Sequence, residues 1–238
     1  MRLTDFKVLS FDCYGTLIDW ETGLWAALQP LIERAHIDRE TALSAFGLLE
    51  AEQEHETPTL PYQDILAHVH AKLATRWNLK STDVMDKAFG LSVGTWPPFP
   101  DTVEALGYLK RHYKLVILSN VDRQNFAATN KRLAVEFDAI CTAEDIGSYK
   151  PDPRNFDYLL NTVRSLGNTK ADLLHTAQSL YHDHAPAERI GIARCWINRR
   201  GDEGAGSGAT KAVQKMPKLD FEFQTLGAMA AAHRAEAH

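Results

Sequence analysis

Five short runs of apolar, largely β-branched residues punctuate the chain, and each has the length of a buried strand. Helix-length segments separate the later runs, and their apolar residues recur every three or four positions, as at Val103, Leu106 and Leu109. Strands that alternate with such helices predict an α/β fold, a parallel sheet with helices on both faces. The predicted strands are Lys7 to Phe11, Leu115 to Leu118, Ala139 to Cys141, Leu173 to Thr176, and Cys195 to Ile197.

The first two predicted strands are separated by about a hundred residues, although a parallel crossover needs only a dozen or so. Apolar residues recur at helical spacing from Leu24 to Ile32 and from Ile65 to Trp77. The stretch WPPFP, from Trp96 to Pro100, then holds the chain extended, because successive prolines forbid a helix. These patterns predict a core made of residues 1–16 and 97–238, with residues 17–96 inserted as an α-helical cap.

The composition is that of a folded globular protein, with 45% hydrophobic and 24% charged residues among 238. The net charge is −5 and no Lys/Arg-rich stripe occurs, so we expect no nucleic-acid partner. No apolar stretch reaches the ~20 residues of a membrane span, and the N-terminus lacks the layout of a secretion signal. The sequence therefore predicts a cytoplasmic protein with no membrane partner.

Two further groups of residues are expected to be structural. Cys13, Cys141 and Cys195 are odd in number and far apart, which favours buried thiols over disulfides or a metal cluster. The segment from Arg200 to Thr210 contains four glycines and predicts a surface loop, since it lacks the strand-then-helix context of a phosphate cradle.

Polar residues follow four of the predicted strands at the point where each strand ends. Asp12 follows the first, Ser119 and Asn120 the second, Lys150 the third, and the segment from Gln178 to Asp183 the fourth. In an open parallel sheet the ligand crevice lies outside the carboxyl ends of the strands. The sequence therefore predicts that two acids, a hydroxyl, an amide and an ammonium group converge there.

Four motifs at these strand ends resemble those of the haloacid dehalogenase (HAD) superfamily, and the resemblance covers nearly the whole chain. FDCYGTL resembles the first motif, ILSN the second, YKPDPRNF the third, and QSLYHD the fourth in altered form. The superfamily implies a Rossmann-like core with a helical cap inserted just after the first motif. This agrees with the organisation that the periodicity predicts.

Tyr14 separates the branches of this superfamily. Its phosphatases carry Asp-x-Asp-Gly-Thr, in which the second acid helps to hold magnesium, and a further acid where Gln178 stands. A phenol with an ordinary pKa near ~10 cannot be an acidic magnesium ligand near neutral pH. The chain resembles more closely the L-2-haloacid dehalogenases, which carry Asp-x-Tyr-Gly-Thr and use no metal. That resemblance implies no cofactor, and an aspartate that displaces a leaving group from C2 of a small carboxylic acid.

The resemblance also implies a role for each residue at the strand ends. Asp12 is the expected nucleophile, kept ionised by Lys150 and by backbone N–H groups of the following loop. Asp183 would orient Lys150 and the hydrolytic water, and Ser119 would bond the nucleophile or the substrate carboxylate. Structural roles stay open for Thr16 as a turn cap, Lys150 as a surface charge and Trp20 as cap packing. The expected substrate-binding residues are Tyr14, Thr16, Trp20, Asn120 and Gln178.

Three histidines, His175, His182 and His184, lie around the fourth motif. A buried strand is expected to point His175 away from the other two, and no Cys or second acid completes a set of metal ligands. We therefore expect no metal site. His182 is a candidate to assist the activation of water, because imidazole titrates near neutrality.

The cap departs from the dehalogenase pattern. Halide-releasing members carry an arginine early in the second cap helix, whereas FGLLEAEQEHE has none and offers five carboxylates or amides. An acidic cap repels a halide and suits a leaving group that becomes an amine. In length and in the position of Asp12, the chain is also similar to superfamily members that open the ring of L-azetidine-2-carboxylate. Against this, Glu50, Glu52, Glu54 and Glu56 stand two residues apart and would face different sides of a helix, as on a solvated surface.

The sequence thus predicts a metal-independent hydrolase that cleaves a carbon–heteroatom bond at C2 of a small 2-substituted or cyclic imino carboxylic acid. The reaction would pass through an aspartyl ester on Asp12, and the leaving group is a halide or a ring nitrogen. The alternatives are a HAD phosphatase and a non-catalytic binding protein of the same fold. A monomer or homodimer is expected, with a small carboxylic acid as its ligand.

Overall fold

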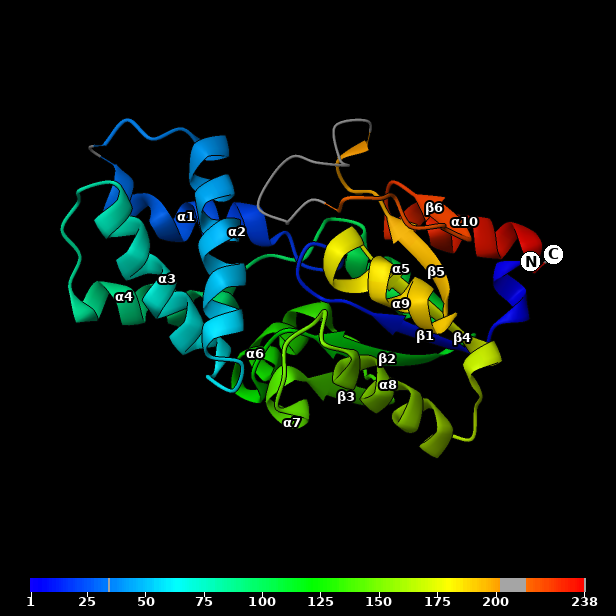
Figure 1. Ribbon diagram of the computed structural model, residues 1–238. Coiled ribbons are helices and arrows are strands. Elements are labelled where there is room, and N and C mark those ends of the chain that lie inside the picture. Colours follow the sequence, from blue (N-terminus) through cyan, green and yellow to red (C-terminus); the bar gives the residue numbers. More distant parts are fainter. Residues whose placement is uncertain (34, 202–212, 238) are drawn as a thin grey trace.

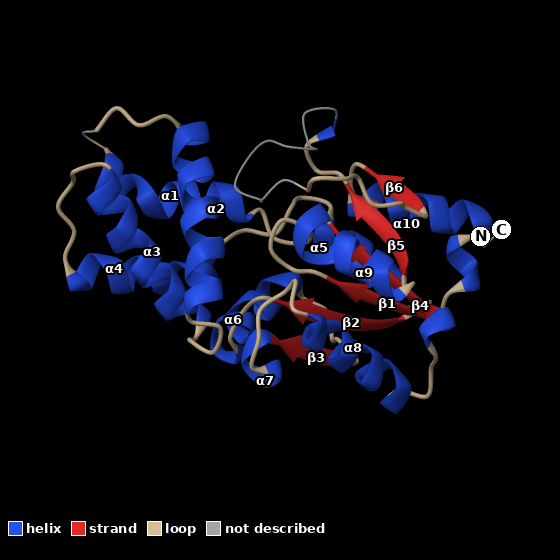
Figure 2. Ribbon diagram, in the orientation of Figure 1, coloured by secondary structure: helices blue, strands red, loops and turns tan. Residues whose placement is uncertain are grey.

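The computed structural model describes residues 1–33, 35–201 and 213–237 (Figure 1, Figure 2). A parallel sheet forms the centre of the core, with the strand order β3-β2-β1-β4-β5-β6. Because β1 lies between β2 and β4, the direction of winding reverses beside β1, and ligands of such sheets bind at this point. The strands are β1 (Val8–Phe11), β2 (Lys114–Ser119), β3 (Ala139–Thr142), β4 (Leu173–Ala177), β5 (Ala193–Ile197) and β6 (Phe221–Phe223).

Both faces of the sheet are apolar and covered by helices. Successive side chains of a strand point to opposite faces, so Leu9 and Phe11 join one hydrophobic cluster and Val8 joins another. Helices α8 and α9 pack on the face of Val8, and α5, α6 and α10 pack on the other. The predicted α/β architecture is therefore confirmed. The core helices are α5 (Thr102–Leu109), α6 (Arg123–Leu133), α7 (Ala143–Ile146), α8 (Pro153–Ser165), α9 (Ala185–Ile190) and α10 (Leu226–Glu236).

Four helices between β1 and β2 gather beside the sheet, at the end opposite the chain termini (Figure 1). The first two are capped by Asp19 and Asp38, which precede them and whose side chains each accept the backbone N–H three residues on. The apolar stripe predicted from Leu24 to Ile32 is buried. The inserted helical cap is therefore present, and its boundaries at residues 17 and 96 stay a prediction. The cap helices are α1 (Trp20–Ile32), α2 (Arg39–Glu56), α3 (Tyr62–Arg76) and α4 (Asp83–Gly90).

A tight turn after β1 carries the chain directly from the sheet into the cap. Gly15 has a φ of +91°, and a Cβ at this position would lie 2.9 Å from Nε1 of Trp20, so the turn requires glycine. The N–H groups of Leu17 and Ile18 both bond to the carbonyl of Cys13. Trp20, the first residue of α1, therefore lies beside the loop that follows Asp12.

Parts of the fold differ from the predictions. The five predicted strands end within two residues of the observed ones, but β6 and α10 were not predicted. The side chains of β6 are half-buried or exposed, so this strand lacks the continuous apolar run that marks the others. The three cysteines are buried free thiols, as predicted. Most of the predicted glycine-rich loop, residues 202–210, lies outside the described residues. None of the helices in the described ranges has the length and apolar character to cross a membrane.

Candidate active site

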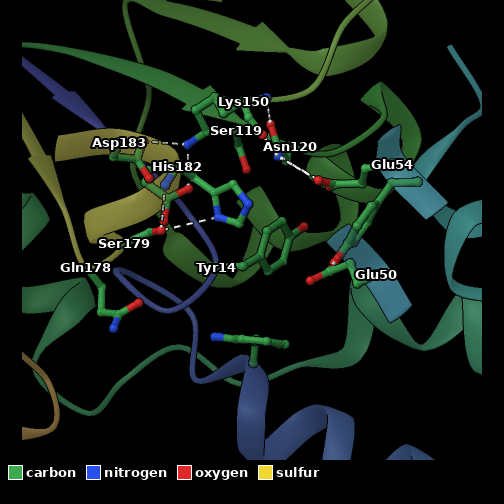
Figure 3. Close-up of a pocket in the computed structure, with 13 residues that line it drawn as sticks. Tyr14, Glu50, Glu54, Ser119, Asn120, Lys150, Gln178, Ser179, His182 and Asp183 are labelled. Carbon is green, nitrogen blue, oxygen red and sulfur yellow. Dashed lines mark hydrogen bonds and ion pairs between the residues drawn. The ribbon is translucent and has the colours of Figure 1, made fainter. Parts of the chain in front are cut away.

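A pocket lies between the carboxyl ends of the strands and the cap helices α1, α2 and α3 (Figure 3). Eight of the nine sequence-predicted site residues line it, and the ninth, Thr16, bonds to Asp12. The structure therefore brings these residues together, and their roles stay predictions. The other lining residues are Glu50, Glu54, Tyr62, Ser179 and His182.

Lys150 lies at the centre of the site and is only 2% exposed. Its Nζ lies 2.9 Å from Oδ1 of Asp12 and 2.7 Å from Oδ1 of Asp183. A third bond, of 2.9 Å, runs to the carbonyl oxygen of Leu118. An ammonium group has three donors, so all of them are used. Lys150 is therefore no surface charge, and it fixes both carboxylates at the floor of the pocket.

The shared ammonium group shapes the protonation of all three side chains. Burial alone would lower the pKa of Lys150, but the two carboxylates raise it above its usual range. Burial also opposes ionisation of Asp183, yet Lys150 and His175 hold the pKa of Asp183 well below its ordinary value. Burial raises the pKa of Asp12, against the opposing charge of Lys150. Asp12 is thus the more basic of the two carboxylates, which suits it to nucleophilic attack.

Hydroxyl and amide groups complete the surroundings of Asp12. Thr16 Oγ1 donates to Oδ2 of Asp12 at 2.9 Å and accepts the N–H of Gln178 at 2.9 Å, so it holds the nucleophile and stabilises the turn. The amide of Asn120 is occupied by the backbone of Lys150, whose N–H it accepts at 2.7 Å. Ser119 Oγ is buried and has no partner among the described residues. Ser119 is therefore available to a ligand.

Aromatic side chains form the opposite wall. The Tyr14 hydroxyl bonds to Oγ1 of Thr129 at 3.0 Å. The ring of Tyr14 stacks on that of Tyr62, with the two ring centroids 6.4 Å apart. Burial raises the pKa of Tyr14 well above its ordinary value, so the phenol is neutral. Trp20 lines the pocket and also packs within the cap, with its ring centroid 5.7 Å from that of Phe46, and its role in binding substrate stays a prediction.

Helix α2 contributes two carboxyl groups to the pocket. The sequence indicated an acidic cap segment but not which of its glutamates face the pocket. Glu50 and Glu54 are four residues apart, so they lie on the same face of α2 and point into the pocket (Figure 3). Glu54 is 8% exposed and accepts a bond from Nδ2 of Asn120 at 3.3 Å, and Glu50 accepts one from the Tyr62 hydroxyl.

Burial raises the pKa of Glu50 to about 7, and burial together with the charge of Glu50 raises that of Glu54. The solvated-surface interpretation is therefore wrong for these two glutamates. The run of glutamates at every second position from Glu50 to Glu56 concealed that Glu50 and Glu54 are four residues apart. That spacing puts two side chains on one helix face.

His175 occupies a position that the sequence did not predict. It is fully buried in β4, and its Nε2 lies 2.9 Å from Oδ1 of Asp183. The sequence predicted that His175 points away from His182 and His184, but its ring centroid lies 6.5 Å from that of His184, and it contacts Asp183 between the two. The reason is a π-helical turn over Leu180–His184, whose wider turn returns Asp183 to β4.

The other two histidines of the fourth motif differ from each other. His182 lines the pocket, and its Nδ1 lies 3.2 Å from Oγ of Ser179. His184 is buried beneath the pocket and donates from Nε2 to the carbonyl oxygen of Ala177 at 2.9 Å. Burial lowers the pKa of His184 to about 4, so this side chain is neutral.

The site does not offer the donor set of a magnesium centre. Tyr14 and Gln178 are neutral at the positions where the resemblance places acids in metal-dependent relatives. Lys150 already neutralises Asp12 from 2.9 Å. Nowhere in the described chain are three or more His, Cys, Asp or Glu side chains grouped to hold a metal ion. The residues present therefore do not fit magnesium.

Comparison with known proteins points in the same direction as the motifs. A protein-family model described as haloacid dehalogenase-like hydrolase matches residues 6–172. An (S)-2-haloacid dehalogenase of Pseudomonas putida is 29% identical over 106 residues, which are 43% of this chain and 45% of that enzyme. One from Pseudomonas fluorescens is 30% identical over the same length. The chain thus matches less than half the length of these curated relatives.

Solved structures share the fold over almost the whole chain. An L-2-haloacid dehalogenase from Xanthobacter autotrophicus, with chloropropionic acid covalently bound, has a TM-score of 0.79 at 20% sequence identity. The similarity covers 96% of this chain and 98% of that one. An identity this low shows a common fold and leaves the substrate to the chemistry of the pocket.

Proposed function

The chain belongs to the haloacid dehalogenase-like hydrolases, and we propose that it cleaves, without a metal ion, a carbon–heteroatom bond at C2 of a small 2-substituted carboxylic acid. The nucleophile is Asp12, and the intermediate is an ester between its carboxylate and C2 of the substrate. The observation that carries this proposal is the contact of one buried ammonium group with both Asp12 and Asp183 at the floor of the pocket.

In the first step, a carboxylate oxygen of Asp12 bonds to C2, and the leaving group departs with the electron pair of its bond to C2. Esterification removes the charge of Asp12, but Lys150 keeps its partner Asp183, so no buried ammonium group is left alone. Tyr14 and Trp20 shield the ester from bulk water. Ser119 Oγ is available to the substrate carboxylate.

In the second step, water adds to Cγ of Asp12, and the bond from Cγ to the substrate oxygen breaks. The water oxygen stays on Asp12, while the product leaves with an original carboxylate oxygen as its hydroxyl. One water proton ends on this hydroxyl and the other goes to solvent. Lys150 Nζ and Thr16 Oγ1 each lie 2.9 Å from an oxygen of Asp12, where they stabilise the charge of the tetrahedral intermediate.

The charges in the pocket favour a nitrogen leaving group over a halide. Glu50 and Glu54 face the pocket, and Lys150 is the one Lys or Arg among its described lining residues. Because the three donors of Lys150 are used, a departing halide would meet carboxylates and no free cation. Burial raises the pKa values of both glutamates, but the charge of a protonated ring nitrogen favours their ionised form, so this nitrogen would be held by them.

We therefore place cyclic imino acids such as L-azetidine-2-carboxylate first among the substrates. Ring opening adds a hydroxyl at C2 and leaves the amine attached to the product. The sequence similarity to (S)-2-haloacid dehalogenases keeps 2-haloacids as the second candidate. A phosphatase would require acids where Tyr14 and Gln178 stand, and a mere binding protein would not require Asp12 and Asp183 to share Lys150.

A single turnover in water labelled with heavy oxygen tests the ester. Enzyme is held in excess over substrate, and the peptide that contains Asp12 is then analysed by mass spectrometry. We expect the label on Asp12 and none in the product. Label that appears directly in the product overturns the ester. Asp12→Asn should abolish turnover, whereas Asp157→Asn, which removes an exposed acid of α8, should not change it.

One purified sample can separate the candidate substrates. L-azetidine-2-carboxylate is assayed for formation of a primary amine, L-2-chloropropionate for chloride release and p-nitrophenyl phosphate for phosphate release, each with and without EDTA. We expect ring opening that EDTA does not change. Phosphate release that EDTA abolishes would establish the phosphatase, and inertness toward the whole panel would favour a binding protein.

A further inference from the structure

Three buried side chains form a continuous hydrogen-bonded line from the core to the site. Ser10 Oγ lies 2.8 Å from Nδ1 of His175, and His175 Nε2 lies 2.9 Å from Oδ1 of Asp183. All three side chains are 0% exposed. None belongs to the catalytic steps derived above except Asp183, whose expected role was to orient water.

The partners of His175 determine where its proton lies. Oδ1 of Asp183 is an ionised acceptor, so Nε2 must carry the hydrogen that it faces. Nδ1 then accepts a hydrogen bond from the Ser10 hydroxyl, because a neutral imidazole has one donor and one acceptor. In the neutral imidazole, Asp183 thus selects the tautomer in which His175 donates to it, and the Ser10 hydroxyl satisfies the other nitrogen.

The two donors to Asp183 leave one of its oxygens free. Lys150 Nζ and His175 Nε2 both bond to Oδ1, at 2.7 Å and 2.9 Å. Oδ2 is buried and has no partner in the described part of the chain, and Asp183 lines the pocket (Figure 3). Two bonds to one oxygen fix the plane of the carboxylate and so fix the direction of Oδ2. A buried carboxylate oxygen without a donor calls for a water or ligand hydroxyl.

We propose that His175 is a positioning residue, which aims Oδ2 of Asp183 at the water that hydrolyses the ester on Asp12. This inference rests on the proposed function, because it concerns the second step of that reaction. His175 acts through Asp183 and touches no substrate. Both of its nitrogens are already bonded, one to Ser10 and the other to Asp183.

The charge of Asp183 agrees with this role. Although burial opposes ionisation, Lys150 and His175 hold the pKa of Asp183 low, so it is a carboxylate and a pure acceptor at neutral pH. Such a weak base orients a water O–H without removing the proton. Misplacement of the water by about 1 Å is enough to cost about 10²-fold in rate.

Two variants of one residue test the inference. His175→Phe fills the site without a donor, and His175→Gln restores an N–H group. With L-azetidine-2-carboxylate and L-2-chloropropionate, rapid quenching and mass spectrometry follow the ester on Asp12. For His175→Phe we expect the ester to form at a rate within about 3-fold of wild type and to decay about 10²-fold more slowly. His175→Gln should recover most of the decay rate.

Slower ester hydrolysis also has a steady-state signature. The values of kcat and KM fall together and kcat/KM stays almost constant, because ester formation is unchanged. A variant that is merely unstable loses active enzyme and leaves KM as it was. His70→Phe is the matched control, because His70 is buried and bonds to the carboxylate of Asp86 at 2.6 Å within the cap. It should alter stability without causing the ester to accumulate.

The outcomes separate this inference from the proposed function. Absence of any adduct in the wild-type enzyme overturns the ester and, with it, the role of His175. An adduct in the wild type that decays equally fast in folded His175→Phe overturns the role of His175 alone. Equal slowing of both steps also overturns it. If His175→Phe does not fold, His175→Leu, which also lacks a donor, carries the same test, and ester decay at the wild-type rate in folded His175→Leu contradicts the inference.

Discussion

Lys150 Nζ lies 2.7 Å from Oδ1 of Asp183, and both side chains are buried. The ammonium group therefore has a permanent partner and a second one, Asp12, whose charge comes and goes during the proposed reaction. In the proposed reaction, Asp12 can therefore lose its charge on esterification without a divalent ion to compensate for the loss.

Removal of the shared cation should destabilise the protein strongly. Lys150→Met leaves Asp12 and Asp183 as adjacent buried carboxylates, so we expect a loss of about 3–5 kcal/mol in the free energy of unfolding at neutral pH. The loss should shrink on acidification, because the carboxylates can then take up protons. Urea unfolding measures it. Lys110→Met removes a half-exposed partner of Asp138 and should cost no more than about 1 kcal/mol. Equal losses in the two variants would contradict the central role of Lys150.

Gly15→Ala should destabilise the loop that carries the nucleophile. The residue has a φ of +91°, and the added Cβ would press on Nε1 of Trp20. We expect a cost of about 1–3 kcal/mol in urea unfolding. Gly107→Ala is the control, since Gly107 is in α5 and a Cβ there meets no atom within 4 Å. That change should stabilise the helix by about 0.5–1 kcal/mol, and a similar gain at Gly15 would show that the turn is not strained.

The stability of the protein should depend on Glu50 between about pH 4.5 and 7. Burial raises the pKa of Glu50 from 4.5 to about 7, so folding takes up a proton in this window. Above about pH 7, Glu50 is ionised in both states and its burial destabilises the folded state fully. Below about pH 4.5, Glu50 is protonated in both states and its burial carries no such penalty. Glu50→Gln should therefore gain stability relative to wild type as the pH rises from 5 to 8. Glu52→Gln, on the exposed side of the same helix, should show no such trend in thermal unfolding.

As the pH falls, ester formation should be lost before the pH reaches the ordinary aspartate pKa of ~3.9. Burial and the charge of Asp183 raise the pKa of Asp12, and the protonated acid cannot attack carbon. A profile of kcat/KM against pH checks this expectation. Asp183→Asn removes the neighbouring negative charge, so the acidic limb for adduct formation should move to lower pH. An unmoved limb would mean that another group controls it.

The glutamates of α2 should decide which leaving group the enzyme accepts. Combined Glu50→Gln and Glu54→Gln removes both carboxyl groups from the pocket with little change in volume. We expect ring opening of L-azetidine-2-carboxylate to fall about 10- to 100-fold, since each lost charged contact is worth about 1.5–3 kcal/mol at most. Chloride release from L-2-chloropropionate should hold steady or rise. A parallel fall of both activities would show that these residues support the fold rather than the choice of substrate.

The sequence predicted the sheet and the strand-end residues because both depend on local patterns. Apolar runs mark β1 to β5, and a polar residue that follows such a run, as Asp12 does, falls at the site by topology alone. What it missed depends on geometry that no local pattern reports. The pocket face of α2 was hidden because Glu52 and Glu56 obscured the spacing of Glu50 and Glu54. The contact of His175 with Asp183 depends on a π-helical turn, which standard helical spacing does not anticipate.

In the proposed reaction, the residues around the Asp12 carboxylate and those that face the leaving group of the substrate belong to different parts of the chain. Asp12, Lys150 and Asp183 lie on segments of the core that follow its strands, whereas Glu50 and Glu54 occupy adjacent turns of a single inserted helix. Substitutions in those two turns can therefore change which substrate the enzyme accepts, while the residues that break the bond stay the same.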